Sequence, residues 1–83
     1  MEIKLIKGSF SGVDAIDIVT RFVHAKIKFQ EEKINHSSNE EDIKMREKRI
    51  KTLQVDLNEA KHFITENGSN ISVESAILIS TKK

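Results

Sequence analysis

A chain of 83 residues forms one small domain, and a domain of this size buries only a modest share of its surface. Charged residues make up 33% and hydrophobic residues 37%, which is typical of a folded, helix-rich protein, and the net charge of +1 argues against a strongly basic nucleic-acid binder. The absence of cysteine excludes disulfides, thiolate metal sites and a thiol nucleophile.

The first element predicted along the chain is a short strand over residues 2–7, EIKLIK. Its apolar residues Ile3 and Leu5 alternate with the charged residues Glu2 and Lys4. The segment GSFSG that follows, residues 8–12, combines glycine and serine in the manner of a turn.

Two long helices are predicted next. Ser11 is a typical N-cap for a helix over residues 12–34, and the polar segment NHSSN interrupts the helical pattern. Asn39 is the N-cap predicted for a second helix over residues 40–67, which Gly68 ends.

The last element is a strand over residues 71–80, in which apolar and polar side chains alternate again. The predicted order of a single domain over residues 1–83 is therefore β-α-α-β, an α+β fold. The short polar loop between the helices predicts that they pair as an antiparallel hairpin, packed on a small antiparallel β-ribbon.

Each helix carries an apolar heptad seam through which the two helices can pack together. The seam of the first helix comprises Val13, Ile16, Thr20, Val23, Ile27, Gln30 and Ile34. That of the second helix comprises Ile43, Arg46, Ile50, Leu53, Leu57, Ala60 and Ile64. Gln30 and Arg46 fall opposite one another in the two seams. One interpretation is that this polar pair sets the register of the hairpin; the other is that it simply lies at a solvent-exposed hairpin tip.

The first helix has a second apolar stripe on the side opposite its seam. This stripe comprises Ala15, Ile18, Phe22, Ala25 and Phe29. Because the second helix has no such stripe, we expect the first helix to be the inner one. A two-stranded ribbon is rarely stable alone, and the apolar ILIS segment of the last strand would be an exposed edge.

These features favour a homodimer. Either the last strands of two copies pair into a four-stranded sheet, or two stripes pack across a two-fold axis. The residues predicted for this interface are Ile18, Phe22, Ala25, Phe29, Ile77, Leu78 and Ile79. The alternative is a monomer whose ribbon covers the first helix by itself.

The basic run KMREKRIK is the one segment that suggests nucleic-acid contacts. Its candidate phosphate ligands are Lys44, Lys48, Arg49 and Lys51. Acidic residues precede the basic ones at helical spacing, however, and no aromatic residue lies between them to stack on bases. We therefore treat weak nucleic-acid binding as the alternative function.

No arrangement typical of catalysis or of a metal site is found in the sequence. His24, His36 and His62 are predicted at three different levels of the hairpin, and no serine pairs with a histidine at a known spacing. The chain also lacks an apolar leader and a membrane-length apolar run. We expect a cytoplasmic, non-enzymatic protein-interaction or regulatory module without cofactors, acting as a homodimer with a further protein partner.

Overall fold

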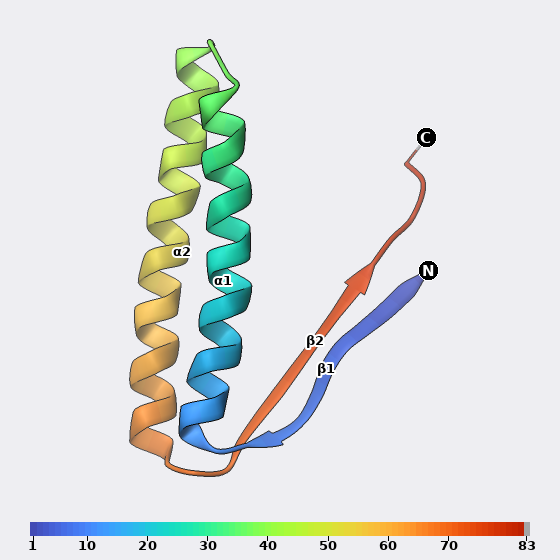
Figure 1. Ribbon diagram of the computed structural model, residues 1–83, viewed down its shortest axis with the longest axis vertical. Coiled ribbons are helices and arrows are strands. Elements are labelled where there is room, and N and C mark those ends of the chain that lie inside the picture. The colour runs from blue at the N-terminus through green and yellow to red at the C-terminus, as the bar shows by residue number, and fades with distance from the viewer. Residues whose placement is uncertain (83) are drawn as a thin grey trace.

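The computed structural model describes residues 1–82. Four elements follow one another in the predicted order: β1 (Glu2–Phe10), α1 (Gly12–Asn35), α2 (Glu40–Asn67) and β2 (Ile71–Leu78). The helices form an antiparallel hairpin, and the strands form a two-stranded antiparallel ribbon that leaves the hairpin at an angle (Figure 1). The predicted α+β class and the β-α-α-β order are confirmed.

The bounds of the strands differ from the prediction. β1 continues through residues 8–10, which were predicted to be a turn, because Gly8 and Phe10 pair with Val73 and Ile71 of β2. Pairing with a partner strand outweighs the weak strand preference of glycine. β2 ends at residue 78 rather than 80, although the ladder continues one pair further, where Met1 and Ile79 exchange backbone hydrogen bonds of 2.8 and 2.9 Å.

Both predicted helix N-caps are present. The Ser11 hydroxyl accepts a hydrogen bond from the backbone N–H of Asp14 at 3.1 Å. The side-chain oxygen of Asn39 accepts hydrogen bonds from the N–H groups of Glu41 and Asp42. Gly68 caps the end of α2 with a φ of 91°, a conformation that side-chain-bearing residues rarely adopt. These local signals fix where the helices start and stop.

The hairpin seam follows the predicted heptads over most of its length but not at its first position. Val13 is 79% exposed, while its neighbour Ala15 is completely buried. A Cβ atom on Gly12 would lie 2.9 Å from the backbone oxygen of Gly68, so the backbones approach closely there. This approach turns the small residues at the start of α1 inward and Val13 outward.

Gln30 and Arg46 meet in the seam. Gln30 is a buried polar residue, 5% exposed, and its Oε1 accepts a hydrogen bond of 2.8 Å from a guanidinium N–H of Arg46. A second N–H of Arg46 donates to Asp42 at 3.1 Å. The pair is thus a hydrogen-bonded contact inside the hairpin; its role in setting register stays a prediction.

The ribbon contains one irregularity, at Leu5. The pairing shifts by one residue between Lys4 and Ile6, so that Leu5 and Ile6 lie together opposite Ser75. A bulge of this kind changes which residues of the bulged strand share a face. After the bulge, Ile6, Gly8 and Phe10 share a face with Ile71 and Val73.

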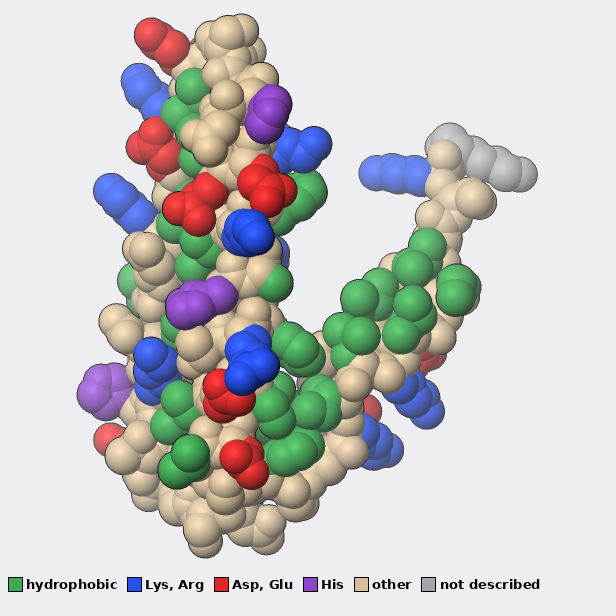
Figure 2. Space-filling view, viewed as in Figure 1, with side chains coloured by type: hydrophobic (Ala, Val, Ile, Leu, Met, Phe, Trp, Pro, Cys, Tyr) green, Lys and Arg blue, Asp and Glu red, His purple; other side chains and the backbone are tan. Residues whose placement is uncertain are grey.

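The ribbon contacts the helices at one end only, which we call the base. Its buried core comprises Ala15, Ile64 and Ile71, with Phe10, Ile16, Val19 and Val73 packed against it. Away from the base the ribbon and α1 diverge, and the molecule has the outline of an open V (Figure 1). Figure 2 shows hydrophobic side chains along the ribbon on the face turned toward this opening.

Candidate dimer interface

The wide end of the V, which we call the mouth, is lined by apolar side chains from both walls. Phe22, Ala25 and Phe29 come from α1, and Leu5 and Ile77 come from the ribbon. These residues, with Ser75, Lys26 and Gln30, enclose an open cavity of about 730 Å³. Phe22 is 41% exposed and Phe29 52% exposed, so the ribbon leaves this part of the second stripe of α1 uncovered, although it covers Ala15 at the base.

Two lysines of α1 lie at the mouth: Lys26 is among its lining residues, and Lys33 contacts Phe29. The ammonium of Lys33 lies over the ring of Phe29, 5.5 Å from its centroid. Such a cation–π contact at an exposed site contributes about 0.5–1 kcal/mol. This contact covers part of one face of a single ring and leaves the rest of the apolar wall open.

The predicted interface residues occupy three different environments. Phe22, Ala25, Phe29 and Ile77 line the mouth together. Ile18 is half-buried, closer to the base. Ile79 alternates with Leu78 along the strand and therefore shares the apolar face of Ile77, whereas Leu78 points to the opposite face of the ribbon.

Leu5 belongs to the mouth but was missing from the predicted interface. The sequence placed Leu5 on the apolar face of the first strand. It gave no sign that an open cavity would separate this face from α1. That relation depends on the angle between the ribbon and the hairpin.

A second open groove runs between α2 and β2 on the side of the base. It has a volume of about 500 Å³, and its apolar lining includes Val19, Ala60, Phe63, Ile71 and Val73. Asp56, Glu59, Ser72 and Glu74 add polar groups at its edges. Phe63 is 63% exposed although it is aromatic. In the sequence, Phe63 is one of three apolar residues outside the seam of the second helix, with Met45 and Val55, that are scattered among charges, and so it gave no sign of belonging to an apolar surface.

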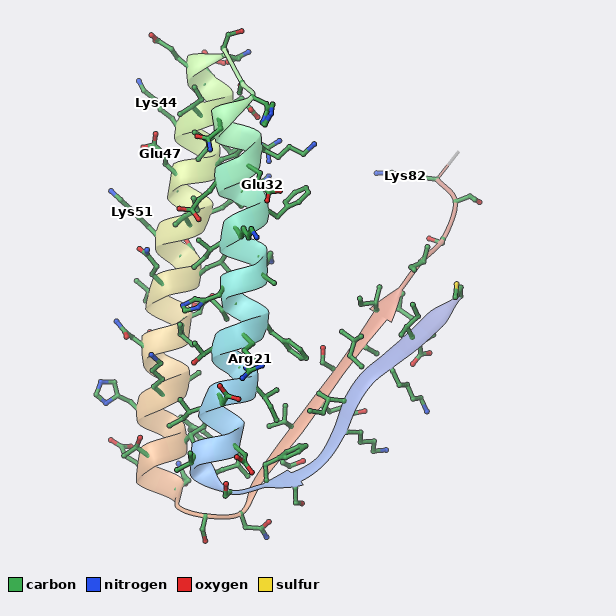
Figure 3. The ribbon with its side chains drawn as sticks, viewed as in Figure 1. Arg21, Glu32, Lys44, Glu47, Lys51 and Lys82 are labelled. Atoms are coloured by element: carbon green, nitrogen blue, oxygen red, sulfur yellow. The ribbon has the colours of Figure 1, made fainter. Side chains whose placement is uncertain are left out.

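The four basic candidates of α2 are divided between two surfaces. Lys48 and Arg49 line a groove of about 450 Å³ together with Lys26 of α1, Met45, Thr52, Leu53 and Asp56. Lys44 and Lys51 extend from the side of α2 that faces away from α1, on either side of Glu47 (Figure 3). The acidic residues interleaved along the helix keep the surface mixed in charge.

The contact between Arg46 and Asp42 affects the acidity of the Asp42 carboxyl. The hydrogen bond that Arg46 donates to Asp42 holds the pKa of that carboxyl below its usual value of 3.8. His36, at the hairpin tip, places its Nδ1 2.8 Å from the backbone oxygen of Glu32. Within residues 1–82, no three histidine, aspartate or glutamate side chains come together as a possible metal site.

No helix within residues 1–82 combines the length and apolar character required to cross a bilayer. No protein-family model matches the sequence, and neither the curated proteins nor the solved structures include a match to it. The open V and the grooves beside it are the features of the molecule that bear on function.

Proposed function

We propose that this protein is a non-enzymatic interaction module that acts as a homodimer. The observation that carries the proposal is the open V, whose walls expose apolar side chains to solvent. Monomeric proteins seldom leave contiguous apolar surface of this kind uncovered, and such surfaces mark association sites. A second copy of the chain is the occupant we propose.

The amount of exposed surface supports a second copy. The chain exposes 6837 Å², whereas a compact monomer of 9.5 kDa exposes about 5,000 Å². Its radius of gyration is 15.4 Å, against about 12 Å for a compact chain of this length. The excess of about 1,800 Å² per chain is about 3,600 Å² for two chains, within the range that obligate homodimers bury.

The measurement that tests this proposal is the mass of the protein in solution by light scattering on a sizing column. We expect twice the 9.5 kDa mass of one chain. A dilution series extends the test to weak association. A mass of one chain at every concentration would overturn the proposal.

The variant Phe22→Lys tests whether the mouth is the surface that is used. Placing an ammonium among apolar residues of a dimer core should weaken association by about 2 kcal/mol or more, roughly 30-fold in Kd. Val55→Lys is the matched control, because Val55 is an exposed apolar residue of α2 that lines neither the mouth nor the other two grooves. Circular dichroism checks that both variants remain helical, and a dimeric, folded Phe22→Lys protein would exclude the mouth.

A second candidate function, weak nucleic-acid binding, is favoured by one observation: Lys26 joins Lys48 and Arg49 along a single groove. Three cations on one surface could contact phosphates, and such binding would weaken as salt rises. Charge reversal at Lys48 and Arg49 should then abolish binding measured at low salt by fluorescence anisotropy with labelled single- and double-stranded oligonucleotides. Absence of binding at low salt would remove this candidate.

A further inference from the structure

We infer that two copies pair through the free edge of β2, antiparallel, about a two-fold axis at Ser75. This inference rests on the proposed homodimer and specifies how its two chains meet. It would convert two ribbons of two strands into one four-stranded sheet, in the order β1-β2-β2-β1.

The two free edges of the ribbon, on β1 and on β2, differ in how readily a further strand could pair with them. The free edge of β1 carries the bulge at Leu5 and the lysines Lys4 and Lys7, and bulges and lysines are the features that protect an edge from pairing. β2 has no bulge and no lysine, and Glu74 is its only charged residue. The edge of β2 is therefore the one open to a second strand.

The hydrogen bonds of the ribbon indicate which backbone groups of β2 are free. Met1 and Ile79 exchange both of their backbone hydrogen bonds, so Ile79 directs its N–H and C=O toward β1. Backbone groups of successive residues in a strand point to opposite edges. The outward-facing residues of β2 are thus the even-numbered ones: Ser72, Glu74, Ala76 and Leu78.

Only one register of two β2 strands meets three conditions together. It must keep the apolar faces on the same side of the sheet, keep the two Glu74 carboxylates apart, and pair the strands over their full length. The faces match only when odd-numbered residues lie opposite odd-numbered ones. Centring the pair on Glu74 would place two carboxylates directly opposite, which is destabilising. Centring it on Ser75 pairs all of residues 71–79 and places Val73 opposite Ile77 and Ile71 opposite Ile79.

The groove between α2 and β2 gives independent support for this register. It lies beside residues Ile71–Glu74, where the end of the partner strand would run. The partner copy's Ile77 and Ile79 would then lie next to Val73 and Ile71, at a groove whose wall includes the exposed ring of Phe63. The apolar residues Ile77 and Ile79, which one copy leaves exposed near its mouth, would thus be covered at the base of the other copy.

A cysteine cross-link tests the register, because the native chain contains no cysteine. Residues directly opposite in a non-hydrogen-bonded pair have Cβ atoms about 4.5–5.5 Å apart, close to disulfide geometry. Ser75→Cys should therefore shift, on mild oxidation, from the mass of one chain to that of two on a non-reducing gel. Ser72→Cys is the matched control, since its two-fold mate would lie about 20 Å away along the strands.

Ala25→Cys tests the other possible dimer, in which the α1 stripes of two copies pack across the two-fold axis. In that dimer, cross-linking is expected at Ala25 and not at Ser75. Light scattering of each variant under reducing conditions reports dimerisation separately from cross-linking. A dimer that cross-links at Ser75 and not at Ser72 supports the inference. A dimer that cross-links at Ala25 but not Ser75, or at neither position, overturns it while leaving the proposed homodimer standing. A monomeric mass overturns both.

Discussion

At both the base and the mouth of the V, α1 stands beside the ribbon, yet only the base, where Ile64 of α2 joins them, is a packed core. At the base, Ala15 is completely buried and Gly12 allows a close backbone approach to Gly68. At the mouth, large residues such as Phe22 and Phe29 face the ribbon across an open cavity. Small residues let the start of α1 approach the end of α2, and the ribbon is held at the base by the short connections and by the packing of Ile71 against Ala15 and Ile64.

An apolar pattern therefore predicts that a face will be buried but does not specify which element or partner will bury it. Both ends of α1 carry apolar residues at helical spacing, and both faces of the V are apolar. Only the base finds its partner within the same chain. The predictions below test whether stability is concentrated at the base, with the mouth reserved for association.

The largest effect on stability is expected at Ile64, which is 4% exposed in the core of the base. Ile64→Ala should lower the free energy of unfolding by about 2–5 kcal/mol, because it leaves a cavity in a small core. Guanidinium denaturation followed by circular dichroism measures this loss. Val13→Ala, at an exposed position of α1, should stay within about 0.5 kcal/mol of the native protein. Equal losses in the two variants would contradict a core confined to the base.

A smaller effect is expected within the helical hairpin, toward its tip. Arg46→Leu leaves the buried Oε1 of Gln30 without its donor, which should cost about 1–3 kcal/mol of unfolding free energy. Adding Gln30→Leu removes the orphaned acceptor and should recover most of that loss. Urea denaturation of the two single variants and the double variant completes the cycle. Additive effects would mean that the observed hydrogen bond contributes no coupling.

The smallest effect concerns acid stability at Asp42. Because its pKa is lowered in the folded state by Arg46, ionised Asp42 stabilises the fold above its unfolded pKa near 3.8. That stabilisation is lost as the pH falls through the folded pKa. The native protein should therefore lose more in Tm than Asp42→Asn when the pH is lowered from 7 to about 2. Parallel losses in Tm would contradict the assigned role of Arg46.

Much of the local structure was predictable because its causes lie within a few residues. Ser11, Asn39 and Gly68 mark helix ends through their own hydrogen bonds or backbone conformation. The heptads also placed Gln30 opposite Arg46. The extension of β1 to Phe10 was missed because it depends on pairing with β2, about 60 residues away along the chain.

The candidate site was predictable only in part. Its α1 wall follows from helical periodicity, which put Phe22, Ala25 and Phe29 on one stripe. Leu5 and Phe63 were missed because each lies on a surface formed by elements distant in sequence. No pattern within one element records the angle at which another element crosses it.

Sequence alone thus determined the four elements, their order and the apolar faces they carry, since capping and side-chain periodicity act over one or two turns or a few strand residues. Tertiary structure decided where those faces meet and where they part. It turned Val13 to solvent where Gly12 approaches Gly68 at the end of α2. It opened the V because the short connections and the core around Ile64 and Ile71 hold the ribbon at one end of the hairpin. These long-range constraints leave the part of the second stripe from Phe22 to Phe29 uncovered within a single chain.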